Sequence, residues 1–135
     1  MSYAGDLTPQ EAWQLLDEHA EALLVDVRTQ AEWDTVGVPD VAPLGKDVAF
    51  VEWVTLPGRR PNPTFLDELE QAGLEPGSER PVVFLCRSGQ RSIAAAMTAT
   101  AAGLGPAYNV LEGFEGAGGL GGSGWRAAGL PWRRR

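Results

Sequence analysis

The segment that most constrains the fold is an apolar run that ends at a cysteine and leads into a helix. Val82 to Leu85 form a short, wholly apolar stretch, and Cys86 follows it. A run of this length and composition is typical of a buried strand in a parallel sheet. After a short polar loop, the alanine-rich stretch from Ser92 to Ala102 predicts a helix that stops near Gly103. Cys86 is therefore expected where a strand meets the N-terminus of a helix.

Capping signals divide the first part of the chain into helix, strand and helix. Residues 8–11 read Thr-Pro-Gln-Glu, a capping box with proline at the first helical position, and they predict a helix that runs through Leu16. The apolar run 23–27 predicts a buried strand. A second capping box at residues 29–32, Thr-Gln-Ala-Glu, predicts a short helix that carries Trp33.

The same alternation continues to the last third of the chain. The stretch 37–61 is rich in proline and glycine and is expected to wrap the surface. Asn62 as N-cap and Pro63 as first helical residue predict a helix over 64–72, and the run 107–111 predicts a last strand. Strands that alternate with helices predict an α/β fold whose parallel sheet has helices on both faces.

Length and composition are those of an ordinary globular protein. The chain has 135 residues, 44% of them hydrophobic and 21% charged, and residues 1–135 are expected to form one domain. The glycine-rich segment 113–124 predicts a surface loop, with a mobile lid over a site as the alternative. The tail 125–135, which contains tryptophan and proline, is expected to dock on the domain. No apolar run approaches the ~20 residues that span a bilayer, so no membrane association is expected.

Cysteine, histidine and charge usage narrow the function classes. One cysteine and one histidine exclude an internal disulfide and argue against a structural zinc site, so no metal and no other cofactor is expected. A free thiol without a secretory signal predicts a cytoplasmic protein. Residues 1–79 carry 16 acidic and 4 basic side chains, whereas residues 80–135 carry 2 and 7. The basic half either forms a solvated face or attracts an anion, while the net charge of −7 argues against nucleic acid as a partner.

The loop after the cysteine has the chemistry of an anion cradle. Backbone N–H groups at a helix N-terminus point at any anion placed there, and nearby arginines favour the ionised form of a thiol. A small buried apolar role is the common alternative for a lone cysteine. The loop, however, supplies two cations, a glycine for a tight turn and two hydroxyl donors in Arg87, Ser88, Gly89, Gln90, Arg91 and Ser92. We therefore predict that Cys86 is a nucleophile at the base of this cradle.

Two segments together resemble the single-domain rhodaneses, a family of sulfurtransferases. The loop 86–92, Cys-Arg-Ser-Gly-Gln-Arg-Ser, is similar to the active-site loop of that family. The segment 24–33, which reads Leu-Val-Asp-Val-Arg-Thr and ends in Glu-Trp, is similar to its early motif. The resemblance covers most of residues 7–115 and implies a rhodanese-like domain with a central parallel sheet of about five strands. Val38 stands where the family usually has histidine, and residues 111–114 hold one glycine where it often has two.

The resemblance implies a transfer of sulfur in two steps. Cys86 would take the outer sulfur of thiosulfate, or of another small anionic donor, as a persulfide. It would then pass this sulfur to a thiol or to a protein acceptor. The six loop residues that follow Cys86 would bind the donor, with Arg87 and Arg91 on its anionic group.

The early motif implies support for the loop rather than catalysis. Asp26 ends a buried strand, and a buried carboxylate needs partners. The resemblance places Asp26 near the loop, and Arg28 is expected to pair with Glu32 or Asp34. Both Asp26 and Arg28 are predicted to act behind the residues that touch the substrate.

Two other functions remain open at this point. A persulfide carrier that serves a partner protein would need the same cysteine. Cysteine phosphatases and arsenate reductases also use a thiolate and an arginine, but the phosphatases place one residue more between them than the four that separate Cys86 from Arg91. The shorter loop favours a persulfide sulfur over a tetrahedral phosphate. The sequence makes no prediction of the oligomeric state.

Overall fold

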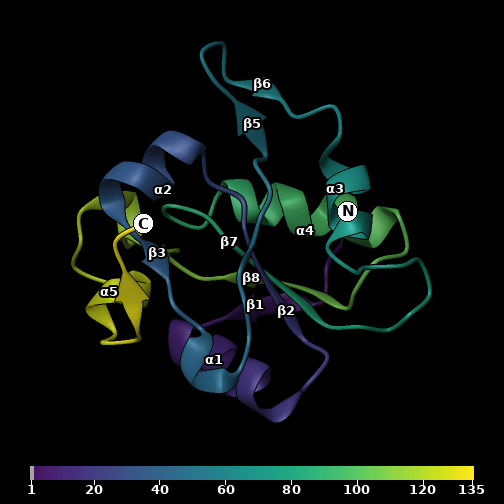
Figure 1. Cartoon of the computed structure of the whole chain (residues 1–135), viewed down its shortest axis with the longest axis horizontal. Helices are drawn as coiled ribbons and strands as arrows, with labels where there is room; N and C mark the ends of the chain where they lie inside the picture. The colour runs from purple at the N-terminus through teal and green to yellow at the C-terminus, as the bar shows by residue number, and fades with distance from the viewer. Residues whose placement is uncertain (1) are drawn as a thin grey trace.

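A five-stranded parallel sheet forms the centre of the protein in the computed structural model, which describes residues 2–135 (Figure 1). Its strand order is β1-β8-β7-β2-β4, and every neighbouring pair is parallel. The strands are β1 (Gly5–Leu7), β2 (Leu23–Asp26), β4 (Ala49–Phe50), β7 (Val82–Leu85) and β8 (Ala107–Val110). The predicted α/β class and the predicted sheet are confirmed.

In the described part of the chain, residues 2–135, five helices accompany the sheet, and the two predicted capping boxes both form. At the start of the first helix the Thr8 hydroxyl accepts from the Glu11 backbone N–H, and the Glu11 carboxylate accepts from the Thr8 N–H. Thr29 and Glu32 repeat the arrangement at the second helix. The helices are α1 (Pro9–Glu18), α2 (Gln30–Val36), α3 (Phe65–Gln71), α4 (Arg91–Ala101) and α5 (Gly124–Ala127).

The predicted N-cap of α3 is wrong by two residues. Thr64, not Asn62, is the N-cap. The Asn62 carboxamide oxygen accepts from the Thr64 backbone N–H at 3.1 Å, and its amide nitrogen donates to the Glu52 carbonyl at 2.9 Å. These bonds make a turn at Asn62, so the helix begins only at Phe65.

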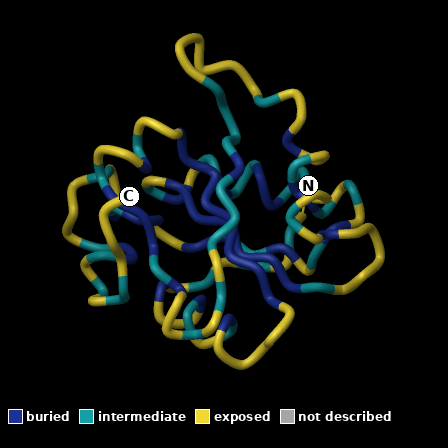
Figure 2. The backbone as a smooth tube through the Cα atoms, in the orientation of Figure 1, coloured by how far each residue is buried: buried dark blue, intermediate teal, exposed yellow. Residues whose placement is uncertain are grey.

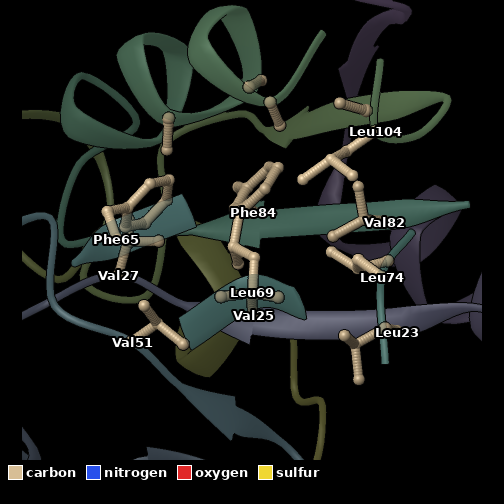
Figure 3. Packing of buried hydrophobic residues seen from close by; sticks show 14 of the residues in the cluster. Leu23, Val25, Val27, Val51, Phe65, Leu69, Leu74, Val82, Phe84 and Leu104 are labelled. Carbon is tan, nitrogen blue, oxygen red and sulfur yellow. The ribbon is translucent and has the colours of Figure 1, made fainter. Parts of the chain in front are cut away.

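Alternate residues of the central strands pack against helices on opposite faces of the sheet. Phe84 and the other members of one cluster lie with α3 and α4, as Figure 3 shows for Phe65 and Leu69 of α3. Leu85 belongs to the cluster on the other face, with Leu16 of α1 and with α5. The central strands are buried, in contrast to the loops at the periphery (Figure 2). Helices therefore cover both faces, as predicted.

The stretch 37–61 runs over the surface and adds four short strands to the fold. One of them, β4, completes the central sheet beside β2. Two others form an antiparallel hairpin that projects from the body of the protein (Figure 1), with an exposed tip (Figure 2). The strands outside the central sheet are β3 (Val38–Pro39), β5 (Val54–Thr55) and β6 (Arg60–Pro61).

The end of the chain is docked on the rest of the fold, as predicted. Trp125 is fully buried, and its indole N–H donates to the Pro131 carbonyl at 2.8 Å. Strand β9 (Trp132–Arg133) pairs antiparallel with β3. The segment 113–124 before it is a loop with one 3₁₀ turn at Ala117–Gly119. Within residues 2–135, no helix has the length and apolar character that a membrane crossing requires.

Candidate active site

Cys86 lies at the carboxyl end of β7, just before the loop that leads to α4. The Gly89 backbone N–H donates to Sγ at 3.1 Å, and the Ser92 hydroxyl oxygen lies 3.1 Å from the same sulfur. Gly89 has φ +100°, a left-handed conformation that glycine adopts without strain. The residue Cys86 is only 1% exposed. The loop thus curls around the thiol and directs a backbone donor at it.

The segment after β8 lies directly beneath this loop. The Phe114 backbone N–H donates to the Cys86 carbonyl at 2.8 Å, and that of Glu115 donates to the Arg87 carbonyl at 2.9 Å. A side-chain carbon at Gly113 would collide with the carbonyl oxygens of Cys86 and Arg87. Glycine at this position is therefore what lets the two backbone segments approach each other.

A buried ion pair lies beside the loop at the end of β2. The Arg28 guanidinium donates to Asp26 through Nε at 3.0 Å and through Nη2 at 2.7 Å, and both side chains are fully buried. Nη2 also donates to the Gly37 carbonyl at 2.8 Å. The guanidinium carbon lies 4.3 Å from the centre of the Phe114 ring, a cation–π contact. We call Asp26, Arg28, Gly113 and Phe114 the loop floor.

The expected pairing of Arg28 with Glu32 or Asp34 is wrong. Arg28 turns back to the Asp26 carboxylate at the end of β2, because a buried carboxylate without a partner is costly. Glu32 bonds to Arg91 instead, and Asp34 lies 3.9 Å from Arg135.

Arg91 and Glu32 form a bidentate ion pair at the edge of the loop. Nη1 and Nη2 of Arg91 donate to the two Glu32 oxygens at 2.8 and 2.9 Å. Burial by itself raises the pKa of Glu32, but the hydrogen bonds and charge of Arg91 and the bonds to Thr29 outweigh it and lower the pKa to about 2. Glu32 is therefore ionised at neutral pH. Its carboxylate binds the Arg91 guanidinium, which the sequence analysis expects to bind the sulfur donor.

An open cleft of about 380 Å³ lies next to this ion pair, and we call it the arginine cleft. Among the predicted residues that line this cleft, Arg87 is the most accessible, because its side chain is 52% exposed. The Nε atom of Arg87 lies 3.4 Å from Glu115. A third arginine, Arg59, comes from the turn of the β5–β6 hairpin. The cleft is lined by Thr29, Ala31, Glu32, Val36, Leu56, Arg59, Arg87, Arg91 and Glu115.

The other loop residues face elsewhere. Ser88, Gly89 and Gln90 line a second cleft of about 400 Å³ together with residues of β8 and of the glycine-rich segment. Ser92 is fully buried beneath the loop. The structure therefore brings Arg87 and Arg91 together at one cleft, but it does not bring Ser88 and Gln90 there.

Sequence reasoning missed the cleft residues Ala31 and Val36 of α2, and it also missed three residues from other segments, Arg59, Leu56 and Glu115. They belong to the hairpin and to the segment after β8, far from the cysteine motif in the chain. Nothing in a single sequence marks them, because their position at the cleft depends on how the hairpin and the segment after β8 pack beside the Cys86 loop. Among residues 2–135, no group of three or more His, Cys, Asp and Glu side chains is arranged to hold a metal ion.

Comparison with known proteins places this chain in a family. The family described as STR4 middle domain matches residues 5–135. The chain belongs to this family. It is 55% identical to Rv0390 from M. tuberculosis, whose crystal structure superposes with a TM-score of 0.88 over 99% of this chain and 100% of the other.

More distant solved structures show the fold. The polysulfide-sulfur transferase homodimer from Wolinella succinogenes is 27% identical, with a TM-score of 0.66 over 96% of this chain and 78% of the other. A rhodanese-like domain protein from Staphylococcus aureus is 22% identical, with a TM-score of 0.58 over 83% of this chain and 89% of the other. The fold is therefore rhodanese-like, as the sequence resemblance implied.

Proposed function

We propose that the protein is a sulfurtransferase that carries sulfane sulfur as a persulfide on Cys86. The observation that carries this proposal is the placement of the only thiol of the chain at the end of β7, with the Gly89 N–H 3.1 Å from its sulfur. A preorganised donor of this kind stabilises negative charge on sulfur. The rhodanese-like fold, shared with a polysulfide-sulfur transferase, supports the same activity.

The reaction divides into two displacements on sulfur. In the first, the Cys86 thiolate attacks the outer sulfur of thiosulfate, a sulfur–sulfur bond to Cys86 forms, and the bond to the inner sulfur breaks. Sulfite leaves with the electron pair of that bond. In the second, an acceptor such as cyanide or a thiolate attacks the terminal sulfur, and the Cys86 thiolate leaves. Each step is a nucleophilic substitution, so no outside oxidant or reductant is needed.

The arginine cleft is the proposed binding place for the anionic group of the donor. Two of its three arginines, Arg59 and Arg87, are not held in bidentate bonds, whereas Arg91 is paired with Glu32. A planar guanidinium with several N–H donors binds oxyanions well. We therefore assign donor binding first to Arg87, with Arg59 as a second contact and Arg91 as the group that shapes the cleft.

Glu32 also weakens the case for phosphate chemistry. A phosphate bound in the loop would need the Arg91 guanidinium, and it would have to displace a carboxylate whose pKa of about 2 keeps it ionised. Together with the four-residue spacing between Cys86 and Arg91, this pairing favours sulfur transfer over a phosphatase activity.

The physiological acceptor is proposed to be a thiol, either small or on a protein. The alternative is a persulfide carrier that delivers sulfur to a partner protein. Both the enzyme and the carrier would hold the sulfur on Cys86. A free thiol that must stay reduced fits a reducing compartment such as the cytoplasm.

Intact mass after treatment with thiosulfate tests the proposal. The wild-type protein should gain the mass of one sulfur atom, and cyanide should remove it. Cys86→Ser should gain nothing, and Ser88→Ala, which keeps the thiol, should still gain the sulfur. A wild-type protein that stays unmodified at high thiosulfate concentration would contradict the proposal. Steady turnover with cyanide separates an enzyme from a carrier, which would transfer efficiently only to a protein thiol.

A further inference from the structure

A chain of hydrogen bonds runs from the edge strand β1 to the sulfur of Cys86. The Oδ1 atom of Asp6 accepts from the Tyr3 hydroxyl at 2.7 Å and from Nδ2 of Asn109 at 3.0 Å. Asn109, on β8, is fully buried, and its Oδ1 accepts from the Ser92 hydroxyl at 2.5 Å. The Ser92 oxygen lies 3.1 Å from Sγ of Cys86. The buried thiol is thus linked to an exposed carboxylate at the edge of the sheet.

The carboxylate of Asp6 fixes the direction of every bond in this chain. An ionised carboxylate only accepts, so the amide nitrogen of Asn109 has to face it. The amide oxygen then faces Ser92 and accepts its single hydroxyl hydrogen. Tyr3 supports this direction, because its hydroxyl donates to the same Asp6 oxygen as Asn109 does. That hydrogen bond, followed by burial and the Asp6 charge, raises the pKa of Tyr3.

The consequence for the sulfur is that Ser92 offers it lone pairs rather than a hydrogen. A thiol can donate its S–H to such an oxygen, whereas a thiolate needs a donor. When Cys86 ionises and its proton leaves to solvent, the Ser92 hydrogen has to rotate toward the sulfur and give up its bond to Asn109. The Gly89 N–H acts in the opposite sense, because it donates to Sγ in either state.

We propose that Asp6 and Asn109 are positioning residues that control, through the hydroxyl of Ser92, how readily Cys86 loses its proton. The inference rests on the proposed function, because persulfide formation requires the thiolate. In this arrangement the Ser92 oxygen turns its lone pairs toward Sγ, and so acts against the Gly89 N–H, which donates to the same atom. The Asp6 carboxylate, remote from the sulfur, thereby limits the fraction of reactive thiolate.

Apart from Arg59 of the hairpin, the charged groups named around the loop are paired with one another. Their charges largely cancel, so the hydrogen bonds to Sγ decide how readily Cys86 ionises. The pairs come from β2 and the residues after it, from α2, from α4 and from the segment after β8, and they are Asp26 with Arg28, Glu32 with Arg91, and Glu115 with Arg87. The positive charge of Arg91 interacts favourably with a Cys86 thiolate, although Glu32 neutralises much of it. Within residues 2–135, the hydrogen bonds to Sγ are those of Gly89 and Ser92.

The pH midpoint of thiolate formation, followed by ultraviolet absorbance, tests the inference. Cys86→Ser supplies the blank, since the chain has one cysteine. In Asp6→Asn, two facing amides can turn around together, so Ser92 becomes free to donate to the thiolate. A hydrogen bond to a charged acceptor predicts a midpoint lower by about one pH unit. Asp17→Asn removes the same charge from an exposed position of α1 and should leave the midpoint unchanged.

A double-mutant cycle shows whether the effect passes through Ser92. In a Ser92→Ala background, Asp6→Asn should no longer shift the midpoint. An unshifted midpoint in Asp6→Asn alone, or an equal shift with and without Ser92, would overturn the inference. These titrations need no substrate. A wild-type protein that gains no sulfur from thiosulfate would reject the proposed function while the midpoints remain measurable, so the two failures are distinguishable.

Discussion

Two regions next to the Cys86 loop, the loop floor and the arginine cleft, differ in burial. In the loop floor, Arg28 and Asp26 are completely excluded from water, and Gly113 touches the loop backbone directly. In the arginine cleft, the side chains of Arg91 and Glu32 are 18% and 21% exposed. Two ion pairs of similar geometry therefore differ in what the loss of one partner costs the protein. A buried pair that loses one partner leaves a charge in a dry environment, whereas water can replace a partner in the cleft.

The largest effect is expected from breaking the floor at Arg28. Arg28→Ala leaves the Asp26 carboxylate buried without its partner, and the free energy of unfolding should fall by about 3 to 5 kcal/mol. Urea denaturation measures this change. Arg135→Ala is the control at the surface, where the guanidinium lies 3.9 Å from Asp34 and over the rings of Trp33 and Phe50, and it should change stability by less than about 1.5 kcal/mol. Equal effects in the two variants would remove the distinction between floor and surface.

The next effect concerns the approach of Gly113 to the loop. Gly113→Ala combines a left-handed backbone, φ +57°, with a collision against the Cys86 carbonyl, so we expect a loss of about 2 to 3 kcal/mol and a displaced loop. Gly121→Ala has a similar backbone, φ +82°, but open space around the added carbon, and it should cost about 1 kcal/mol. Thermal or urea unfolding compares the two, and a cost at Gly121 as large as that at Gly113 would contradict the packing argument.

The pH dependence of stability in Glu32→Gln distinguishes the ion pair of the arginine cleft from the buried pair of the loop floor. The pKa of Glu32 is about 2 in the folded protein and 4.5 as its ordinary value. The ionised carboxylate therefore stabilises the fold fully above pH 4.5, and this contribution is lost as pH falls toward 2. At neutral pH the variant should lose about 1 to 2 kcal/mol, because solvent screens a partly exposed pair.

Urea titrations at several pH values measure the Glu32 effect. The difference between wild type and Glu32→Gln should shrink as the solution is acidified through that range. Glu70→Gln, on an exposed position of α3, is the control and should show no such convergence. A difference that stays constant with pH would mean that the charge of Glu32 does not contribute.

The smallest effect is expected at Glu112, which neighbours Gly113 but is exposed. Its φ of +62° is a left-handed conformation in a residue with a side chain. Glu112→Gly should therefore stabilise the protein by about 0.5 kcal/mol, the relief of strain being partly offset by a more flexible unfolded chain. Glu75→Gly, at an exposed turn, should instead destabilise slightly. A calorimetric comparison decides, and a stabilised Glu75→Gly variant would refute the strain argument.

The sequence predicted those parts of the site that depend on local signals. The strand before Cys86, the turn at Gly89 and the start of α4 all follow from residues that are neighbours in the chain. Both capping boxes were readable for the same reason, since their partners are three residues apart.

The parts that depend on distant contacts could not be read in this way. The partner of Arg91, 59 residues away, and the contribution of Arg59 from the hairpin depend on tertiary packing. The partner of Arg28 is local, yet the prediction of Glu32 or Asp34 is wrong, because which carboxylate is buried beside the guanidinium depends on the fold. Asn62 failed as a predicted N-cap since its side chain forms a turn that holds Glu52 and Thr64.

The hydrogen bond between Asp6 and Asn109 joins residues that are 103 positions apart, and this has a consequence for the order of folding. Closing so long a loop costs chain entropy before any contact compensates for it, and contacts of high sequence separation slow folding. Strand β1 lies at the edge of the sheet, where β8 is its neighbour, so its pairing requires β8. We therefore expect the hydrogen bonds around Cys86 to be completed late in folding, and hydrogen exchange at β1, pulsed during refolding, measures when they form.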